Sequence, residues 1–154
     1  MDSIIDTRTL RLVHIFEAPI ERVFAAWTDP GQFMQWMCPP GFGLDRCELE
    51  ARTGGVWRVH GYKPDGSPFA KSGVYREVRR PERLVFTWGH HADDCFASQR
   101  GHETTVELTF RAIGDATELT LMHGPFVDLP TFSGHTEGWK GCFDKLDAFV
   151  REGA

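Results

Sequence analysis

The stretch GHTEGWKGCFDKLDAFV, residues 134–150, predicts a long helix near the C-terminal end of the chain. At about 100° per residue, one stripe of this helix carries His135, Trp139, Cys142, Phe143, Leu146 and Val150. A second stripe beside it holds Gly134, Gly138, Gly141 and Lys145. Each interior glycine costs a helix about 1 kcal/mol relative to alanine. The glycine flank therefore indicates either that another element packs closely there or that a ligand needs the room.

Upstream of this helix, alternating apolar and polar residues predict seven strands. Four of them fall at residues 8–17, 42–51, 56–62 and 68–79, and the other three contain Phe86, Leu108 and Leu121. Short turns such as KPDG, residues 63–66, join neighbouring strands, and strands joined in this way are antiparallel. After the first strand, two short helices are predicted from the spacing of Ile20, Val23, Phe24 and Trp27, and of Phe33, Trp36 and Met37.

These elements predict an α+β fold. An antiparallel sheet has one face to bury, and only one long helix is available to cover it. We expect a curved seven-stranded antiparallel sheet wrapped around the long C-terminal helix, residues 136–151, with the two short helices after the first strand. The 154 residues suit one domain, spanning residues 1–154.

Composition and charge narrow the expected partners and location. The net charge is -5, and Arg79-Arg80 is only a pair, so neither nucleic acid nor an anionic membrane is an expected partner. The cysteines form no CxxC motif, which predicts reduced thiols in a cytoplasmic protein. The start MDSIIDTRTL does not resemble a signal peptide, and no segment approaches about 18 apolar residues.

Five tryptophans indicate large apolar surfaces. Tryptophans that converge would wall an apolar pocket with a few polar points, which is the usual form of a ligand site. Plain core packing is the alternative for each of them. The predicted ligand-binding residues are Trp36, Met37, Trp57, Phe86, Trp88, Leu121, His123, His135 and Trp139.

Two histidines of that set are expected to face inward. His123 shares a strand face with Leu121, and His135 shares the helix stripe with Trp139. A buried imidazole could orient a polar ligand group or act as an acid or base. The alternative is a pair of structural histidines whose hydrogen bonds are satisfied. No arrangement for covalent catalysis accompanies them.

The loop from His90 to His102 holds enough histidine, aspartate and cysteine to suggest a metal. Its spacing matches no known site, and metal sites need a fixed surrounding shell. We therefore predict a solvated polar loop, no metal and no other cofactor.

Five segments carry a resemblance to a known family. They are APIERVFAAWTDPGQFMQW (18–36), GGVWRV (54–59), SGVYREVRRPERLVFTW (72–88), TELTLMHGPF (117–126) and GHTEGWKGCFDKL (134–146). The chain resembles the bacterial START-like, or SRPBCC, helix-grip proteins. More narrowly, it is similar to the branch of homologues of the activator of the ninety-kilodalton heat-shock protein ATPase. The resemblance implies a helix-grip fold with a cavity between helix and sheet.

Three functions follow as expectations. The leading one is binding of a hydrophobic or amphipathic small molecule in the cavity between the sheet and the C-terminal helix, in a monomer or a homodimer. The second is a co-chaperone-like regulator of a heat-shock ATPase, although eukaryotic activators carry an additional N-terminal domain. The third is a cyclase or aromatase type of enzyme that uses His123 and His135 as acid and base. Binding without catalysis is preferred.

Overall fold

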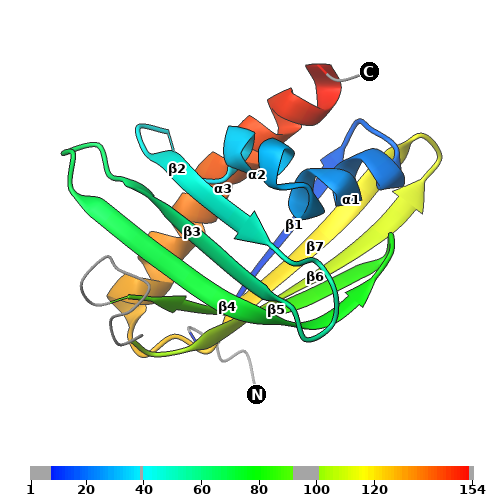
Figure 1. Cartoon of the computed structure of the whole chain (residues 1–154). Helices are drawn as coiled ribbons and strands as arrows, with labels where there is room; N and C mark the ends of the chain where they lie inside the picture. The colour runs from blue at the N-terminus through cyan, green and yellow to red at the C-terminus, as the bar shows by residue number, and fades with distance from the viewer. Residues whose placement is uncertain (1–7, 39, 92–100, 153–154) are drawn as a thin grey trace.

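The structure is a computed structural model that describes residues 8–38, 40–91 and 101–152. Within these residues the expected α+β helix-grip fold is confirmed, with two short helices after the first strand and a long helix at the end (Figure 1). The elements in chain order are β1 (Leu10–Phe16), α1 (Ile20–Thr28), α2 (Pro30–Trp36), β2 (Gly43–Leu49), β3 (Val56–Tyr62), β4 (Pro68–Arg79), β5 (Arg83–His90), β6 (Thr104–Ile113), β7 (Ala116–Gly124) and α3 (Leu129–Glu152).

The strands form one curved antiparallel sheet in the order β1-β7-β6-β5-β4-β3-β2. Consecutive strands are neighbours from β2 to β7, and β1 closes the other edge against β7. The register aligns apolar residues across four strands, in the row Leu12, Leu121, Leu108 and Leu84. The last three are fully buried, which identifies the concave face as the core side of the sheet.

Helix α3 begins earlier than the sequence predicts. The prediction placed its start near Thr136 because Pro130 reads as part of a loop, whereas α3 starts at Leu129. A proline is tolerated in the first helical turn, where its missing N–H would have no partner in the helix. Oδ1 of Asp128 accepts a hydrogen bond from the N–H of Thr131 at 2.8 Å and so satisfies another free donor of that turn.

Helix α3 crosses the concave side of the sheet, and α1 and α2 lie on the same side (Figure 1). The predicted apolar stripe of α3 is buried over Trp139, Cys142, Phe143, Leu146 and Val150. Arg22 of α1 donates hydrogen bonds to the carbonyls of Phe149 and Val150. Its positive charge there also interacts favourably with the negative C-terminal end of the dipole of α3. These hydrogen bonds fix the C-terminal half of α3 to α1.

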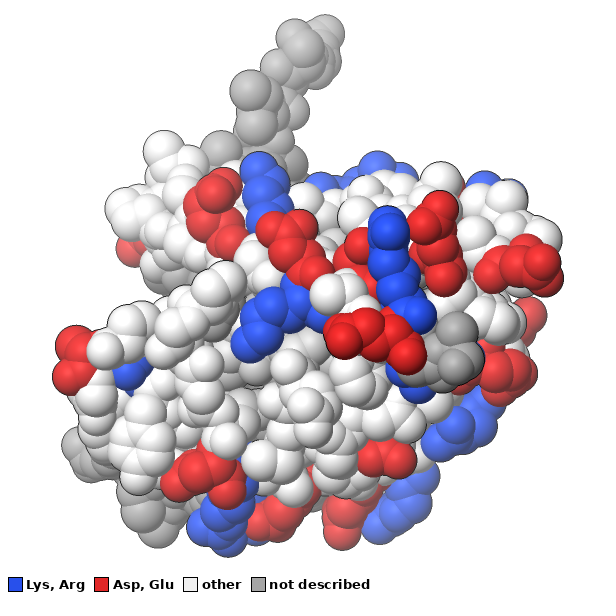
Figure 2. All heavy atoms as spheres, turned by 90° about the horizontal axis from the view of Figure 1, so that it is seen from above, with Lys and Arg blue, Asp and Glu red and all other residues white. Residues whose placement is uncertain are grey.

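On the face shown in Figure 2, Lys and Arg alternate with Asp and Glu, and no field of a single sign forms. None of the helices in residues 8–38, 40–91 and 101–152 is both long and apolar enough to span a membrane.

Candidate ligand cavity

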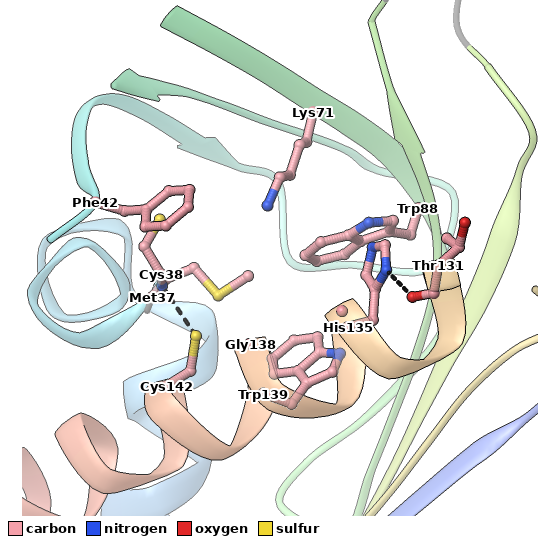
Figure 3. A pocket seen from close by; sticks show the side chains of 11 residues that line it. Met37, Cys38, Phe42, Lys71, Trp88, Thr131, His135, Gly138, Trp139 and Cys142 are labelled. Carbon is pink, nitrogen blue, oxygen red and sulfur yellow. Dashed lines mark hydrogen bonds between the residues drawn. The ribbon is translucent and has the colours of Figure 1, made fainter. Parts of the chain in front are cut away.

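A cavity of about 290 Å³ lies between the N-terminal half of α3, the segment after α2 and strands β4 and β5 (Figure 3). Its walls are largely aromatic and sulfur-containing. The lining residues are Met37, Cys38, Phe42, Lys71, Trp88, Thr131, Gly134, His135, Gly138, Trp139 and Cys142. Ligand pockets of proteins typically start at about 300 Å³, so this hollow suits a small ligand.

The glycine flank of α3 forms part of the cavity wall. Both Gly134 and Gly138 line the hollow. A Cβ atom built on Gly134 would meet no other atom within 4 Å, so no backbone packs against this position. Of the two reasons that the sequence offers for the flank, room beside the helix is therefore the one that applies at Gly134.

The structure divides the predicted ligand-binding residues into two groups. Four line the cavity: Met37, Trp88, His135 and Trp139. Five lie elsewhere in the core and do not line it: Trp36, Trp57, Phe86, Leu121 and His123. The indole N–H groups of Trp36 and Trp57 donate to the carbonyls of Ala26 and Thr87, at 2.9 and 2.8 Å. These two tryptophans are fixed by the backbone and complete the core behind the wall.

His123 ties the cavity wall to the sheet through a chain of hydrogen bonds. The indole N–H of Trp139 donates to Nδ1 of His123 at 3.0 Å. An indole nitrogen can only donate, so the neutral imidazole carries its proton on Nε2. That proton is donated to Oγ1 of Thr104 at 2.7 Å, and the Thr104 hydroxyl donates in turn to the carbonyl of Trp88. Both ring nitrogens are therefore occupied.

The environment of His123 holds the ring neutral. The side chain is fully buried, and desolvation lowers its pKa well below the ordinary value of 6.5. His135 and Lys71, whenever they are protonated, act in the same direction. The geometry therefore indicates a structural role for His123, which holds Trp139 and Trp88 in position. It does not favour proton exchange between His123 and a ligand.

His135 is the histidine that faces the cavity. Its Nδ1–H donates to the carbonyl of Thr131 one turn earlier, at 2.9 Å. Its Nε2 lies 3.4 Å from Nε2 of His90. That nitrogen of His90 accepts a hydrogen bond from the indole N–H of Trp88, also at 3.4 Å. Desolvation lowers the pKa of His135, and the charge of Lys71 lowers it further. The hydrogen bond to Thr131 acts in the opposite direction and raises this pKa. A neutral His135 thus presents a polar edge in a mostly apolar wall.

The prediction from sequence missed Lys71, which is the one ammonium group among the described residues that line the cavity. Lys71 lies on β4, and its Nζ points into the hollow (Figure 3). Strand alternation places it on the same face as Phe69 and Tyr75, which are buried. Desolvation lowers the pKa of its ammonium group. A lysine within the apolar face of a predicted strand was the signal that could have identified it.

Cys38 and Cys142 form the sulfur-containing side of the cavity. Cys142 Sγ accepts a hydrogen bond from the backbone N–H of Cys38 at 3.2 Å, and Lys145 donates to the carbonyl of Cys38. These two contacts support Cys38 in a left-handed backbone conformation, at φ 104°, which is strained for a residue with a side chain. Desolvation raises the pKa of the Cys142 thiol to about 12 and also raises that of Cys38, so both are thiols at pH 7.

The predicted polar loop from His90 to His102 falls mostly outside the described residues, which omit 92–100. His102 is described, and its Nε2 donates to the carbonyl of Pro125 at 2.8 Å. Within residues 8–38, 40–91 and 101–152, no three histidine, cysteine, aspartate or glutamate side chains gather as they would around a metal ion.

A curved antiparallel sheet that grips one long helix and leaves a hollow beside it defines the SRPBCC, or helix-grip, class of domain. In general terms this is a ligand-binding fold. The family model described as Activator of Hsp90 ATPase homolog 1-like protein matches residues 17–151, and the chain belongs to this family.

Solved structures of bacterial proteins share the whole fold. The AHSA1 protein from Silicibacter pomeroyi is 30% identical, with a TM-score of 0.85 over 95% of this chain and 99% of its own. A protein from Chromobacterium violaceum is 25% identical, with a TM-score of 0.83 over 93% of this chain and 96% of its own. A protein from Mycobacterium smegmatis is 23% identical, with a TM-score of 0.81 over 97% and 94%, and supports the fold alone. No curated protein matches the chain.

Proposed function

We propose that this protein binds a hydrophobic or amphipathic small molecule in the cavity between α3 and the sheet. The main observation in support is the cavity itself, whose wall combines the rings of Phe42, Trp88 and Trp139 with few polar groups. Apolar surface withdrawn from water contributes about 25 cal/mol per Å², so an apolar ligand would gain free energy by entering. A volume near 290 Å³ equals roughly ten water molecules of the liquid. Because bonded atoms pack more densely than water molecules, it suits a ligand of about ten to twenty heavy atoms.

The rigidity of the wall supports this proposal. Trp139 and Trp88 are held through His123 and Thr104, and their rings lie 5.5 Å apart between centroids. A wall whose side chains are already fixed needs little ordering when a ligand binds, and this lowers the entropic cost of binding. Gly134 and Gly138 leave the neighbouring flank of α3 without side chains.

The test is a titration of the purified protein with N-phenyl-1-naphthylamine, a neutral apolar dye whose fluorescence rises in apolar surroundings. The expected result is a saturable rise with a stoichiometry of one dye per chain. The close contact with Trp88 and Trp139 should also quench the tryptophan emission in parallel. A non-saturating signal without any change in tryptophan emission would contradict the proposal.

The other two functions stay predictions. The family name refers to an activator of an ATPase, and stimulation of a purified chaperone ATPase by this protein would test that role directly. For a cyclase or aromatase type of enzyme, the donor and acceptor of His123 are already committed to Trp139 and Thr104. Only His135 of the predicted pair faces the cavity, so we favour binding without catalysis.

A further inference from the structure

Lys71 is surrounded by apolar groups on the wall of the cavity. Its Nζ lies 4.8 Å from the ring centroid of Trp88 and 5.0 Å from that of Phe69. Such cation–π contacts compensate part of the desolvation of the ammonium group. Aromatic faces nevertheless do not replace the hydrogen-bond acceptors that three N–H donors require.

Among the described residues, no carboxylate pairs with Lys71 and no oxygen accepts a hydrogen bond from it. Two other lysines show the contrast. Lys140 lies 3.4 Å from a carboxylate oxygen of Glu137, and Lys145 donates to the carbonyl of Cys38 at 3.2 Å. The protonated thiols of Cys38 and Cys142, on the facing wall, supply no negative charge. Lys71 therefore places an amino group in an apolar hollow without a counter-charge from the described residues.

We propose that the ligand of this cavity carries one anionic group, a carboxylate in the simplest case, which accepts hydrogen bonds from Nζ of Lys71. This inference rests on the proposed function of the same cavity and specifies its ligand. The apolar remainder of the ligand lies against Trp88, Trp139 and Met37. Buried charges are stable when paired and hydrogen-bonded, so the anion supplies what the protein lacks at this position.

The surrounding charges agree with an anion at this place. Lys63 adds to the positive potential that lowers the pKa of Lys71, and the charge of Lys71 in turn lowers the pKa values of His90, His123 and His135. A carboxylate beside Lys71 would offset this positive potential at all four groups. A ligand with an amine at the same point would add a further positive charge and would be rejected.

The experiment compares octanoate with octanamide, which has the same chain and nearly the same shape but no charge. Binding of each is measured by isothermal titration calorimetry at pH 7 to the wild-type protein, to Lys71→Met and to Lys140→Met. Lys71→Met keeps most of the length of the side chain and removes the amino group from the cavity. Lys140→Met removes the same charge from the exposed side of α3 and serves as the control.

In the wild-type protein and in Lys140→Met, octanoate should bind about tenfold or more tightly than octanamide. In Lys71→Met, octanoate should weaken by about the same factor, while octanamide stays within about twofold. The proposal of an anionic ligand is wrong if the two compounds bind the wild type with equal affinity, or if Lys71→Met weakens the binding of both equally. Either result would leave the proposed binding of apolar ligands intact. Absence of binding by both compounds and by the apolar dye would overturn the proposed function as well.

Discussion

The indole N–H of Trp139 on α3 donates to Nδ1 of His123 on β7 at 3.0 Å. Both side chains are almost completely buried. This bond joins the gripped helix to the sheet next to the candidate cavity. It also fixes the tautomer of His123, which then bonds to Thr104. The same contact therefore sets both the position of the cavity wall and the tautomer of the histidine behind it.

Trp139→Phe should destabilise the protein by about 1–3 kcal/mol, because the substitution leaves Nδ1 of His123 buried without a donor. The measurement is the free energy of unfolding in urea. Trp27→Phe is the matched control, since the indole nitrogen of Trp27 is buried and has no hydrogen-bond partner in the described part of the chain. A loss of stability in Trp27→Phe as large as that in Trp139→Phe would show that ring packing, not the hydrogen bond, carries the effect.

The stability of the protein should fall as the pH is lowered below about 6.5, partly because of His123. Its pKa in the folded protein is depressed, so the unfolded chain binds a proton at a pH where the folded protein does not. The unfolded state is then favoured by about 1.4 kcal/mol for each pH unit below 6.5, until the folded pKa is reached. Between pH 6.5 and pH 5, this histidine alone can cost at most about 2 kcal/mol.

His123→Leu tests the origin of this pH dependence. The variant should be less stable than the wild type at pH 7, because Trp139 and Thr104 lose a partner. Its stability should nevertheless fall less steeply between pH 7 and pH 5, as measured by urea unfolding at several pH values. If the two proteins show parallel slopes, another group is responsible for the acid sensitivity.

Gly134→Ala should stabilise the protein by up to about 1 kcal/mol, because alanine is the better helix former and its methyl group meets empty space. A rise in melting temperature measures the gain. Gly73→Ala provides the contrast on β4, since a Cβ there would collide with the carbonyl oxygen of Thr87 and the indole nitrogen of Trp57. A lower melting temperature for Gly134→Ala would mean that close packing, rather than free room, maintains this glycine.

The fold was predictable because its signals are periodic and local. Alternation along the strands and the stripe of Trp139, Phe143 and Leu146 on α3 define the buried faces, and short turns define the antiparallel order. The start of α3 was not predictable in the same way. Pro130 is compatible with both a loop and a first helical turn, and only the capping bond from Asp128 decides between them.

The candidate site was predictable in part. Periodicity predicts that Trp57 and Trp88 both point inward. It does not show that Trp57 packs in the core whereas Trp88 lines the cavity. That difference depends on how strands β3 to β5 curve away from α3, which is a property of the whole sheet. Lys71 was missed because a charged residue in a strand is ordinarily assigned to the solvent face.

The central claim is that the hollow beside α3 is the binding site, and filling it by mutation tests this most directly. Gly138→Leu places a leucine side chain on the cavity wall, whereas Ser133→Leu adds the same side chain at an exposed position of α3 that does not line the cavity. Both variants are titrated with N-phenyl-1-naphthylamine after circular dichroism has shown that they are folded. The account predicts that Gly138→Leu loses about tenfold or more in affinity for the dye and that Ser133→Leu binds as the wild type does. Equal affinities in the two folded variants would contradict it.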